Sequence, residues 1–474
     1  MNETEYALDD DIAAIATALS PAALSIIRSS GKNAFEKAAR IFSRPHKLLA
    51  SRGNEIIHGW IVDGSKKIDE VVVCTYRAPK SFTGEDSVEI ICHGGLSITM
   101  RIFKLFQASG FRQAKPGEFT FRSFIAGKSD LTKAEAVKEI IDAKTAQVAE
   151  RAAQRLAGNL YANMQHAKDL ILKQIAELDV QIEYPEDEEL IPVRIKTDKI
   201  TSAVQLLEKT ISAWSLQKIF SEGAKLVLAG RPNAGKSLLF NALLNEERAI
   251  VSDCAGTTRD WLEQELNFNG LPIKLYDTAG LRFTREHIEQ LGIDKTKQLS
   301  ENADLILYLL DASQIQSNIL LEKDDRDFLS AEKYTHIPKV LVFTKSDLLP
   351  KGTTDYLKPH AEKLLEEKLA DEYLFISAKE RSGIDTLVEK TYRLLISEDI
   401  TTDELSVGTE RQKQATEKAL SFLQHALKAV EMEIPSDAVI LDLEEALRYI
   451  AEITGELKSD DILNEIFSGF CVGK

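Results

Sequence analysis

A glycine-rich stretch that contains one lysine and one serine offers the clearest chemistry in this sequence. Residues 230–237 read Gly-Arg-Pro-Asn-Ala-Gly-Lys-Ser, between an apolar run at 225–229 and a helix-forming run at 238–244. In this strand–loop–helix context, glycines allow main-chain N–H groups to surround phosphate oxygens at the start of a helix. We expect Lys236 to reach the β- and γ-phosphates of a nucleoside triphosphate, and Ser237 to bind Mg²⁺. The context disfavours the alternative of a chance glycine-rich loop.

Two later segments could complete a site for magnesium and the γ-phosphate. Residues 256–260 read Gly-Thr-Thr-Arg-Asp, and Thr258 is the expected second hydroxyl ligand of Mg²⁺. Residues 277–280 read Asp-Thr-Ala-Gly and follow a strand-forming run. We expect Asp277 to hold the magnesium shell, and we expect the Gly280 amide to sense the γ-phosphate.

Two further segments, each directly after an apolar strand-forming run, predict which base is bound. Residues 344–347 read Thr-Lys-Ser-Asp, and residues 377–379 read Ser-Ala-Lys. The Asp347 carboxylate can accept hydrogen bonds from the N1–H and the exocyclic amine of guanine, which adenine cannot offer. The motif more often begins with asparagine, so Thr344 can make fewer bonds there but leaves base selection to Asp347. The pattern indicates a GTP site and disfavours a P-loop ATPase or kinase.

Spacing alone leaves the residue that positions the attacking water open. Leu281 stands where Ras-like enzymes carry a water-positioning glutamine, and leucine cannot take that role. Glu289, on a predicted helical stretch, is long enough to reach back, although spacing favours a solvated helix-face carboxylate. Asn233, inside the P-loop, could hold a monovalent cation against the phosphates in place of an arginine finger. Its alternative role is loop capping.

The composition is that of a soluble globular protein, and we expect a cytoplasmic location. Of the 474 residues, 44% are hydrophobic and 28% are charged, and no apolar run approaches the roughly 18 residues that span a bilayer. The formal net charge of -16 argues against non-specific binding of nucleic acid, although a local basic groove stays possible. Four scattered cysteines show no disulfide framework: Cys74, Cys92, Cys254 and Cys471.

Three textures along the chain predict a multidomain fold of α/β and α type. Short β-rich runs alternate with helical stretches near the N-terminus, which predicts an α+β domain. Residues 131–183 contain no proline and one glycine, which predicts a long amphipathic helix, and a similar texture returns at 410–462. A Ras-like P-loop domain inserted into a discontinuous helical domain explains this order. The predicted domains are 1–122 (N-terminal), 123–221 and 396–474 (helical), and 222–395 (P-loop GTPase).

With these motifs, the chain resembles the MnmE (TrmE) family of tRNA-modification GTPases over its full length. The resemblance includes Leu281 and the terminal residues 467–474, Phe-Ser-Gly-Phe-Cys-Val-Gly-Lys. It also includes the N-terminal segments 81–86 with 93–95, 116–120 and 128–136. The Cys-x-Gly-Lys end is particularly specific, because many GTPases share the P-loop and very few share the tail.

The resemblance implies a homodimer in which K⁺ and facing switch loops of two G domains assemble the active site. Asn233 would bind K⁺ through its side chain, and Glu289 would orient the water. The other K⁺ ligands implied are Thr257 and the main chains of Ser252 and Cys254. The full set of expected GTP-binding residues is Asn233, Ala234, Gly235, Lys236, Ser237, Leu238, Ser252, Asp253, Cys254, Ala255, Gly256, Thr257, Thr258, Asp277, Thr278, Ala279, Gly280, Thr344, Lys345, Ser346, Asp347, Ser377, Ala378 and Lys379.

The resemblance further implies that the N-terminal domain dimerises and binds a tetrahydrofolate derivative, in the 5-formyl or 5,10-methylene form. The matching folate positions are Arg28, Glu89, Lys128 and the terminal Lys474. A carboxylate at Glu89 can take two bonds from the pterin edge, although an ordinary strand-edge carboxylate is the alternative. Cys471 would lie near the one-carbon site as a possible reactive thiol, or else as a small buried hydrophobe.

An MnmG-type flavoprotein is the implied partner, in a heterotetramer. Together they would add an aminomethyl-type group to C5 of the wobble uridine of certain tRNAs. The segment 18–24 lacks the glycine-rich sequence usual in the family, and Ser252 stands where threonine is common. The rival hypothesis is a GTPase switch in ribosome assembly or RNA binding, which predicts a basic RNA-binding appendage.

Overall fold

The computed structural model describes residues 6–183, 195–212, 214–244, 263–277, 301–315, 321–350, 352–396, 406–457 and 460–474. It divides into two compact units. The first comprises residues 1–138, 154–208 and 409–474, and the second comprises residues 139–153 and 209–408. Among the described residues, none of the helices combines the length and the apolar character that a membrane span requires.

The N-terminal part of the first unit is a six-stranded sheet in the order β3-β4-β5-β2-β1-β6. The β-rich runs expected from the sequence lie in its central strands, and only β1 and β6 pair in parallel. The strands are β1 Ile12–Ile15, β2 Leu24–Ser30, β3 Glu55–Asp63, β4 Lys66–Tyr76, β5 Ser87–His93 and β6 Arg112–Gln113.

Three helices cover one face of this sheet: α1 Ala34–Ala39, α2 Pro45–Leu49 and α3 Leu96–Ala108. Their apolar side chains, including Phe35 and Phe106, pack on alternate strand residues such as Ile27 and Ile90. The alternation follows from the two-residue period of a strand. The sequence expectation of an α+β domain is confirmed.

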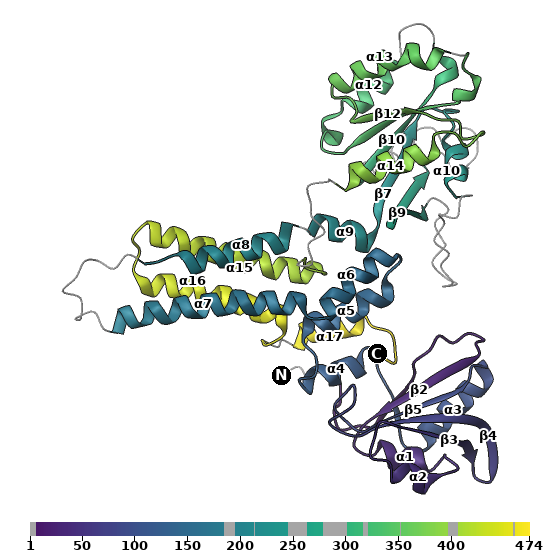
Figure 1. The fold of residues 1–474 in the computed structure, drawn as a ribbon, viewed down its shortest axis with the longest axis vertical. Helices are drawn as coiled ribbons and strands as arrows, with labels where there is room; N and C mark the ends of the chain where they lie inside the picture. The colour runs from purple at the N-terminus through teal and green to yellow at the C-terminus, as the bar shows by residue number, and fades with distance from the viewer. Residues whose placement is uncertain are drawn as a thin grey trace. The chain divides into compact units, whose positions relative to one another are not determined.

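Long helices from both sides of the inserted domain form the helical part of the first unit (Figure 1). Helix α16 packs on both α7 and α15, and α8 joins the bundle through two hydrogen-bonded pairs, Lys199–Glu177 and Gln424–Glu208. The helices are α7 Asn159–Glu183, α8 Asp198–Ser212, α15 Glu410–Glu431 and α16 Ser436–Thr454. Helices more than 200 residues apart in the sequence therefore pack together, as expected for a discontinuous helical domain.

The single long helix expected at 131–183 is interrupted twice, giving α5 Leu131–Asp142, α6 Ala146–Leu156 and α7. The Thr145 hydroxyl accepts from the Val148 amide, which gives α6 its own N-terminal cap. Gly158 separates α6 from α7 with a φ of +101°, a conformation that glycine adopts at helix ends. No proline marks either break, so composition alone did not reveal them.

The second unit is built on a six-stranded sheet in the order β12-β11-β10-β7-β9-β8, parallel except for the β8–β9 hairpin. One core lies between the sheet and α9, α10 and α14, and a second lies between the sheet and α12 and α13. The elements are β7 Ala224–Gly230, β8 Glu263–Phe268, β9 Leu271–Asp277, β10 Leu305–Asp311, β11 Lys339–Thr344, β12 Glu372–Phe375, α9 Trp214–Glu222, α10 Lys236–Leu244, α12 Lys323–Leu329, α13 Thr353–Glu366 and α14 Ile384–Leu395.

Helix α6 and the residues before it pack on the β8–β9 hairpin of this sheet. Val148 enters the core beside Phe268, and Lys144 forms an ion pair with Glu265. The Gln147 amide donates to the main-chain oxygen of Asn269 over 3.4 Å. The hairpin joins the strand after residues 251–262 to the strand that ends at Asp277, so α6 contacts the element between two expected phosphate-sensing segments.

Candidate nucleotide-binding and N-terminal sites

The P-loop runs from the end of β7 to the start of α10, as the sequence predicted. Gly230 has a φ of +132°, and a Cβ there would lie 2.3 Å from the main-chain oxygen of Leu309 on β10. Only glycine permits this approach. Asn233 and Gly235 also have positive φ values, of +63° and +89°. The loop therefore curves back on itself and delivers the chain to the N-terminus of α10, where N–H groups favour an anion.

Two main-chain oxygens of the P-loop hold the Lys236 side chain over the loop. Its Nζ donates to the oxygens of Gly230 and Arg231, each over 2.7 Å, and the residue is only 8% exposed. An ammonium group held there lies beside the loop that would surround the phosphates. Ser237 follows in the first turn of α10, the position expected for the Mg²⁺ ligand.

The base motif lies directly against the P-loop. Thr344, the last residue of β11, is buried and donates from its hydroxyl to the main-chain oxygens of Ala234 (2.8 Å) and Leu310 (3.1 Å). Asp347 accepts from the Ser377 hydroxyl over 2.7 Å, so the two base segments are hydrogen-bonded to each other. The structure thus brings the P-loop, the segment 344–347 and the segment 377–379 together at one edge of the sheet.

A lysine–aspartate pair that sequence reasoning missed stiffens the base motif. Lys345 has a φ of +57°, and its Nζ lies 2.6 Å from Asp311 Oδ2. Burial alone raises the pKa of Asp311, but hydrogen bonds from Lys345 and Ser313 outweigh it, so the pKa lies below its ordinary value. Asp311 is the last residue of the buried strand β10, a position that could have marked it as a site residue.

Most of the other residues predicted for the nucleotide site are not among those that the structure describes. The segment 252–258, residues 278–280, Leu281 and Glu289 lie outside the described residues. Asp277 ends β9, the neighbour of β7 in the sheet. The assignments of the switch residues, of Glu289 and of all the K⁺ ligands, Asn233 included, therefore stay predictions.

The N-terminal sheet brings three of the four expected folate residues together. Arg28 on β2 and Glu89 on β5 are register partners, and their side chains form an ion pair of 2.9 Å. Arg28 also donates to the main-chain oxygen of Gly473 over 2.9 Å. Burial lowers the pKa of Lys474, and the Arg28 charge lowers it further, while Glu89 acts in the opposite direction.

The C-terminal tail packs on the segment 116–120 of the N-terminal domain. Val472 pairs with Pro116, and the Phe119 amide donates to the main-chain oxygen of Lys474 over 3.1 Å. A cavity of about 420 Å³ lies beside Val472. Cys471 is exposed, so the alternative of a small buried hydrophobe is wrong. The cavity is lined by Ala14, Ile15, Thr17, Leu19, Met100, Phe103, Gln113 and Val472.

Lys128, the fourth expected folate residue, lies elsewhere. Its Nζ donates to the main-chain oxygens of Pro79 and Ser81, at the start of the segment 81–86. Within the described residues, no recorded interaction joins it to Arg28, Glu89 or Lys474. Lys128 therefore acts on the loop conformation in this structure.

Two family models match the chain, one described as the GTP-binding protein TrmE N-terminus over residues 11–128 and one as the MnmE helical domain over residues 131–471. The tRNA modification GTPase MnmE of Treponema denticola is 51% identical over 475 residues, with 99% of each chain covered. The chain belongs to the MnmE family.

Other MnmE relatives cover the chain equally well. The tRNA modification GTPase MnmE of Treponema pallidum (strain Nichols) is 40% identical over 495 residues and the full length of both chains. That of Borrelia turicatae is 40% identical over 471 residues, 98% of each chain. The names of the MnmE relatives and the P-loop with its base motif both indicate GTPase activity. The chain is a GTP hydrolase.

Two solved structures of GTP-binding proteins are similar to part of the chain. Era from Aquifex aeolicus has a TM-score of 0.29 and 25% identity, covering 42% of this chain and 67% of that one. The FeoB G-domain from Methanococcus jannaschii has a TM-score of 0.26 and 22% identity, covering 36% of this chain and 97% of that one. The assignment depends on the sequence relatives and not on these similarities.

Proposed function

We propose that this chain is a K⁺-stimulated GTPase, activated when two G domains of a homodimer face each other, that drives tRNA modification in the cytoplasm. With an MnmG-type flavoprotein partner it adds an aminomethyl-type group to C5 of the wobble uridine of certain tRNAs. The one-carbon unit comes from a tetrahydrofolate derivative in the 5-formyl or 5,10-methylene form. Membership of the MnmE family supports the proposal, and the hydrogen bond that joins Thr344 to Ala234 carries its GTPase part.

The GTP site fits a magnesium nucleotide in its charge and shape. Lys236 provides a fixed positive charge at the P-loop, and the Ser237 hydroxyl stands at the N-terminus of α10. Thr258 and Asp277 are the proposed second hydroxyl ligand and the support of the magnesium shell. Mg²⁺ itself would neutralise charge that develops on the phosphate oxygens. Guanine selection falls to Asp347, whose orientation the Ser377 hydroxyl fixes.

Of the proposed K⁺ ligands, Asn233 lies in the described part of the chain. It is exposed at the crest of the P-loop with a positive φ, and among the described residues its side chain makes no hydrogen bond. The described part of the chain thus contains no loop-capping bond from Asn233. An amide oxygen in this place suits K⁺, with Ser252, Cys254 and Thr257 as the other proposed ligands. Glu289 is the proposed water-orienting residue.

The N-terminal site fits a folate in the chemistry of its donors. Arg28 Nε is buried and has no hydrogen-bond partner within the described structure, so a ligand acceptor would satisfy it. Glu89 presents a carboxylate to a pterin edge, and Lys474 offers a cation for an anionic tail. The adjacent cavity of about 420 Å³ is of the size that small-molecule sites have. The exposed thiol of Cys471 stands at this end of the chain.

Two measurements on the full-length protein test this proposal. GTPase rates in K⁺ and in Na⁺ are compared for wild type and Asn233→Ala, and we expect K⁺ stimulation in wild type only. Equal rates of wild type in both salts would remove the cation mechanism. Titration with 5-formyltetrahydrofolate tests the N-terminal site, with Arg28→Ala and Glu89→Gln as weakened variants. If wild type does not bind, the GTPase switch in ribosome assembly or RNA binding becomes the better hypothesis.

A further inference from the structure

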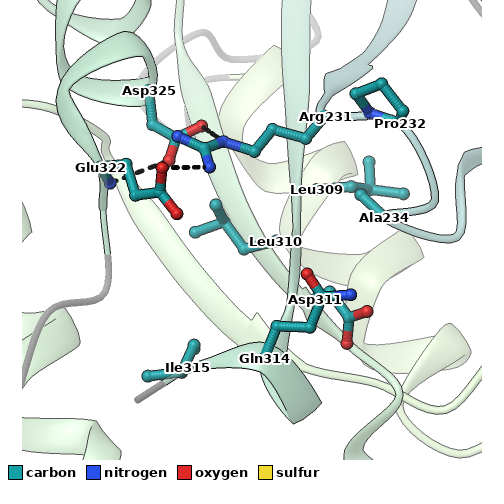
Figure 2. Close-up of a pocket in the computed structure, with 10 residues that line it drawn as sticks. All are labelled: Arg231, Pro232, Ala234, Leu309, Leu310, Asp311, Gln314, Ile315, Glu322 and Asp325. Atoms are coloured by element: carbon teal, nitrogen blue, oxygen red, sulfur yellow. Dashed lines mark hydrogen bonds and ion pairs between the residues drawn. The ribbon is translucent and has the colours of Figure 1, made fainter. Parts of the chain in front are cut away.

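The P-loop carries a second cation whose side chain extends toward α12 (Figure 2). Arg231 Nε lies 2.9 Å from Asp325 Oδ1, and Nη1 lies 2.5 Å from Glu322 Oε2. We propose that Arg231 and Asp325 are positioning residues of the GTP site: their ion pair holds the P-loop main chain in the shape that binds the phosphates. This inference deepens the GTPase part of the proposed function and does not depend on K⁺, folate or tRNA.

Asp325 is the fixed end of this pair. It is 3% exposed and accepts hydrogen bonds from Arg231 Nε, from the Tyr308 hydroxyl (2.7 Å) and from the Glu322 amide (3.0 Å). Burial raises the pKa of Tyr308, and the Asp325 charge raises it further, so Tyr308 stays protonated and donates. Donors from the P-loop, β10 and the start of α12 thus fix one carboxylate. Glu322 is largely exposed, so its bond to Arg231 contributes little by comparison.

The pair acts on the residue that holds Lys236. The main-chain oxygen of Arg231 accepts from Lys236 Nζ, and Gly230 before it is wedged against the oxygen of Leu309. The other end of the loop is held at Ala234 by Thr344. Freeing the Arg231 side chain would leave the first half of the loop held by the close approach of Gly230 and by the hydrogen bonds to the Arg231 oxygen. The loop amides and Lys236 would then have to be ordered by the nucleotide, which lowers affinity.

Two other roles for Arg231 fit the geometry less well. An arginine finger needs a charge available to the phosphates, but two carboxylates already neutralise this guanidinium. A purely stabilising role is also a weak explanation, because buried ion pairs often add little stability. Moreover, Arg231 Nη2 is buried without a partner in the described part of the chain, which is itself a cost.

The test measures the dissociation constants of fluorescent GTP and GDP analogues, together with KM and kcat for GTP, on the full-length protein without tRNA. Arg231→Ala should weaken nucleotide binding and raise KM by about 10-fold, the scale of one charge-assisted hydrogen bond, with kcat nearly unchanged. Asp325→Asn, which keeps an oxygen acceptor and removes the charge, should do the same. The double variant should be no weaker than the worse single variant, because the two residues act as one unit.

The matched control is Arg326→Ala, on the next residue of α12, whose guanidinium pairs with Glu367 on the surface. It should leave nucleotide affinity unchanged. Thermal unfolding of every variant separates affinity from folding, and Arg231→Lys should recover part of the lost affinity. Wild-type affinity in both Arg231→Ala and Asp325→Asn would overturn the proposal. A loss confined to kcat would overturn it too, and would mark Arg231 as a transition-state arginine.

Discussion

The Thr344 hydroxyl donates over 2.8 Å to the main-chain oxygen of Ala234, which joins the base motif to the end of the P-loop. Its second bond, to the oxygen of Leu310, ties the same side chain to the neighbouring strand β10. The phosphate-binding and base-binding segments are therefore one hydrogen-bonded assembly. The threonine that departs from the more common asparagine still makes this connection.

Thr344→Val should weaken nucleotide binding without changing the shape of the side chain. The substitution leaves two buried main-chain oxygens without this donor, and we expect about a 10-fold loss of affinity for a fluorescent GDP analogue. Thr391→Val on α14 is the matched control, since the Thr391 hydroxyl is buried and has no partner among the described residues. Equal affinities for Thr344→Val and wild type would show that the bond does not support the site.

Asp347→Asn should reduce the preference for guanine. The amide replaces one charged acceptor by a donor, which opposes the N1–H and amine of guanine but suits xanthine, which has a carbonyl at C2. We expect the GTP-to-XTP affinity ratio to fall roughly 100-fold, the scale of one to two charged hydrogen bonds. Competition binding measures the ratio, and Asp355→Asn, in an exposed pair with Lys358, serves as control. An unchanged ratio would contradict the assignment of Asp347.

Gly270→Ala should destabilise the second unit through α6. Gly270 has a φ of +92°, and a Cβ there would lie 2.6 Å from the Gln147 side chain. Gly352→Ala is the matched control, because Gly352 has a φ of +86° and no atom lies within 4 Å of its Cβ position. It measures the cost of the strained backbone alone, about 1 kcal/mol. The denaturant midpoint should fall slightly further for Gly270→Ala than for Gly352→Ala, because the flexible Gln147 side chain must move aside and give up its bond to Asn269. Adding Gln147→Ala should recover the difference, and no recovery would mean that the Gln147 side chain is not its cause.

Glu118→Gln should destabilise the first unit in a pH-dependent way. Glu118 is fully buried and accepts from Arg112 (2.6 Å) and Arg122 (3.0 Å). Burial alone raises its pKa, but the hydrogen bonds outweigh it, so the folded-state pKa lies below the ordinary value. The ionised carboxylate therefore stabilises the fold above the unfolded pKa of about 4.3, and this stabilisation is lost as pH falls through the folded-state pKa.

We expect Glu118→Gln to lose about 3 kcal/mol of unfolding free energy at pH 7, because the buried guanidinium of Arg122 and the half-buried one of Arg112 both lose this charged partner. The difference from wild type should narrow below about pH 4. Denaturant titrations at several pH values measure it, with the exposed Glu36→Gln as control. A difference that stays constant down to pH 3 would exclude a charge-based role.

The nucleotide site could be predicted from the sequence where contiguous residues define it. The P-loop at 230–237 and the base motif at 344–347 each pair a strand with a turn, and both fold as expected. Arg231 and Asp325 could not be paired in advance, because 94 residues separate them, the P-loop pattern does not specify the residue at position 231, and Asp325 lies outside every motif. Only the tertiary fold brings α12 beside the P-loop.

In the helical and N-terminal parts, prediction from the sequence failed for other reasons. Residues 143–145 interrupt the helical pattern without a glycine or proline, so only the Thr145 cap reveals the start of α6. Family resemblance placed Lys128 with Arg28, but its flexible side chain reaches two main-chain oxygens of a neighbouring loop instead. Local patterns specify elements well, whereas the partners of long charged side chains depend on packing that they do not encode.

The central claim is that GTP hydrolysis at this P-loop serves modification of the wobble uridine. Mass spectrometry of nucleosides from the wobble position of tRNA tests it in cells that lack this protein. The account predicts that the C5 aminomethyl-type group is absent, that wild-type protein restores it, and that Lys236→Ala does not. Unchanged modification without the protein, or full restoration by Lys236→Ala, would contradict the account.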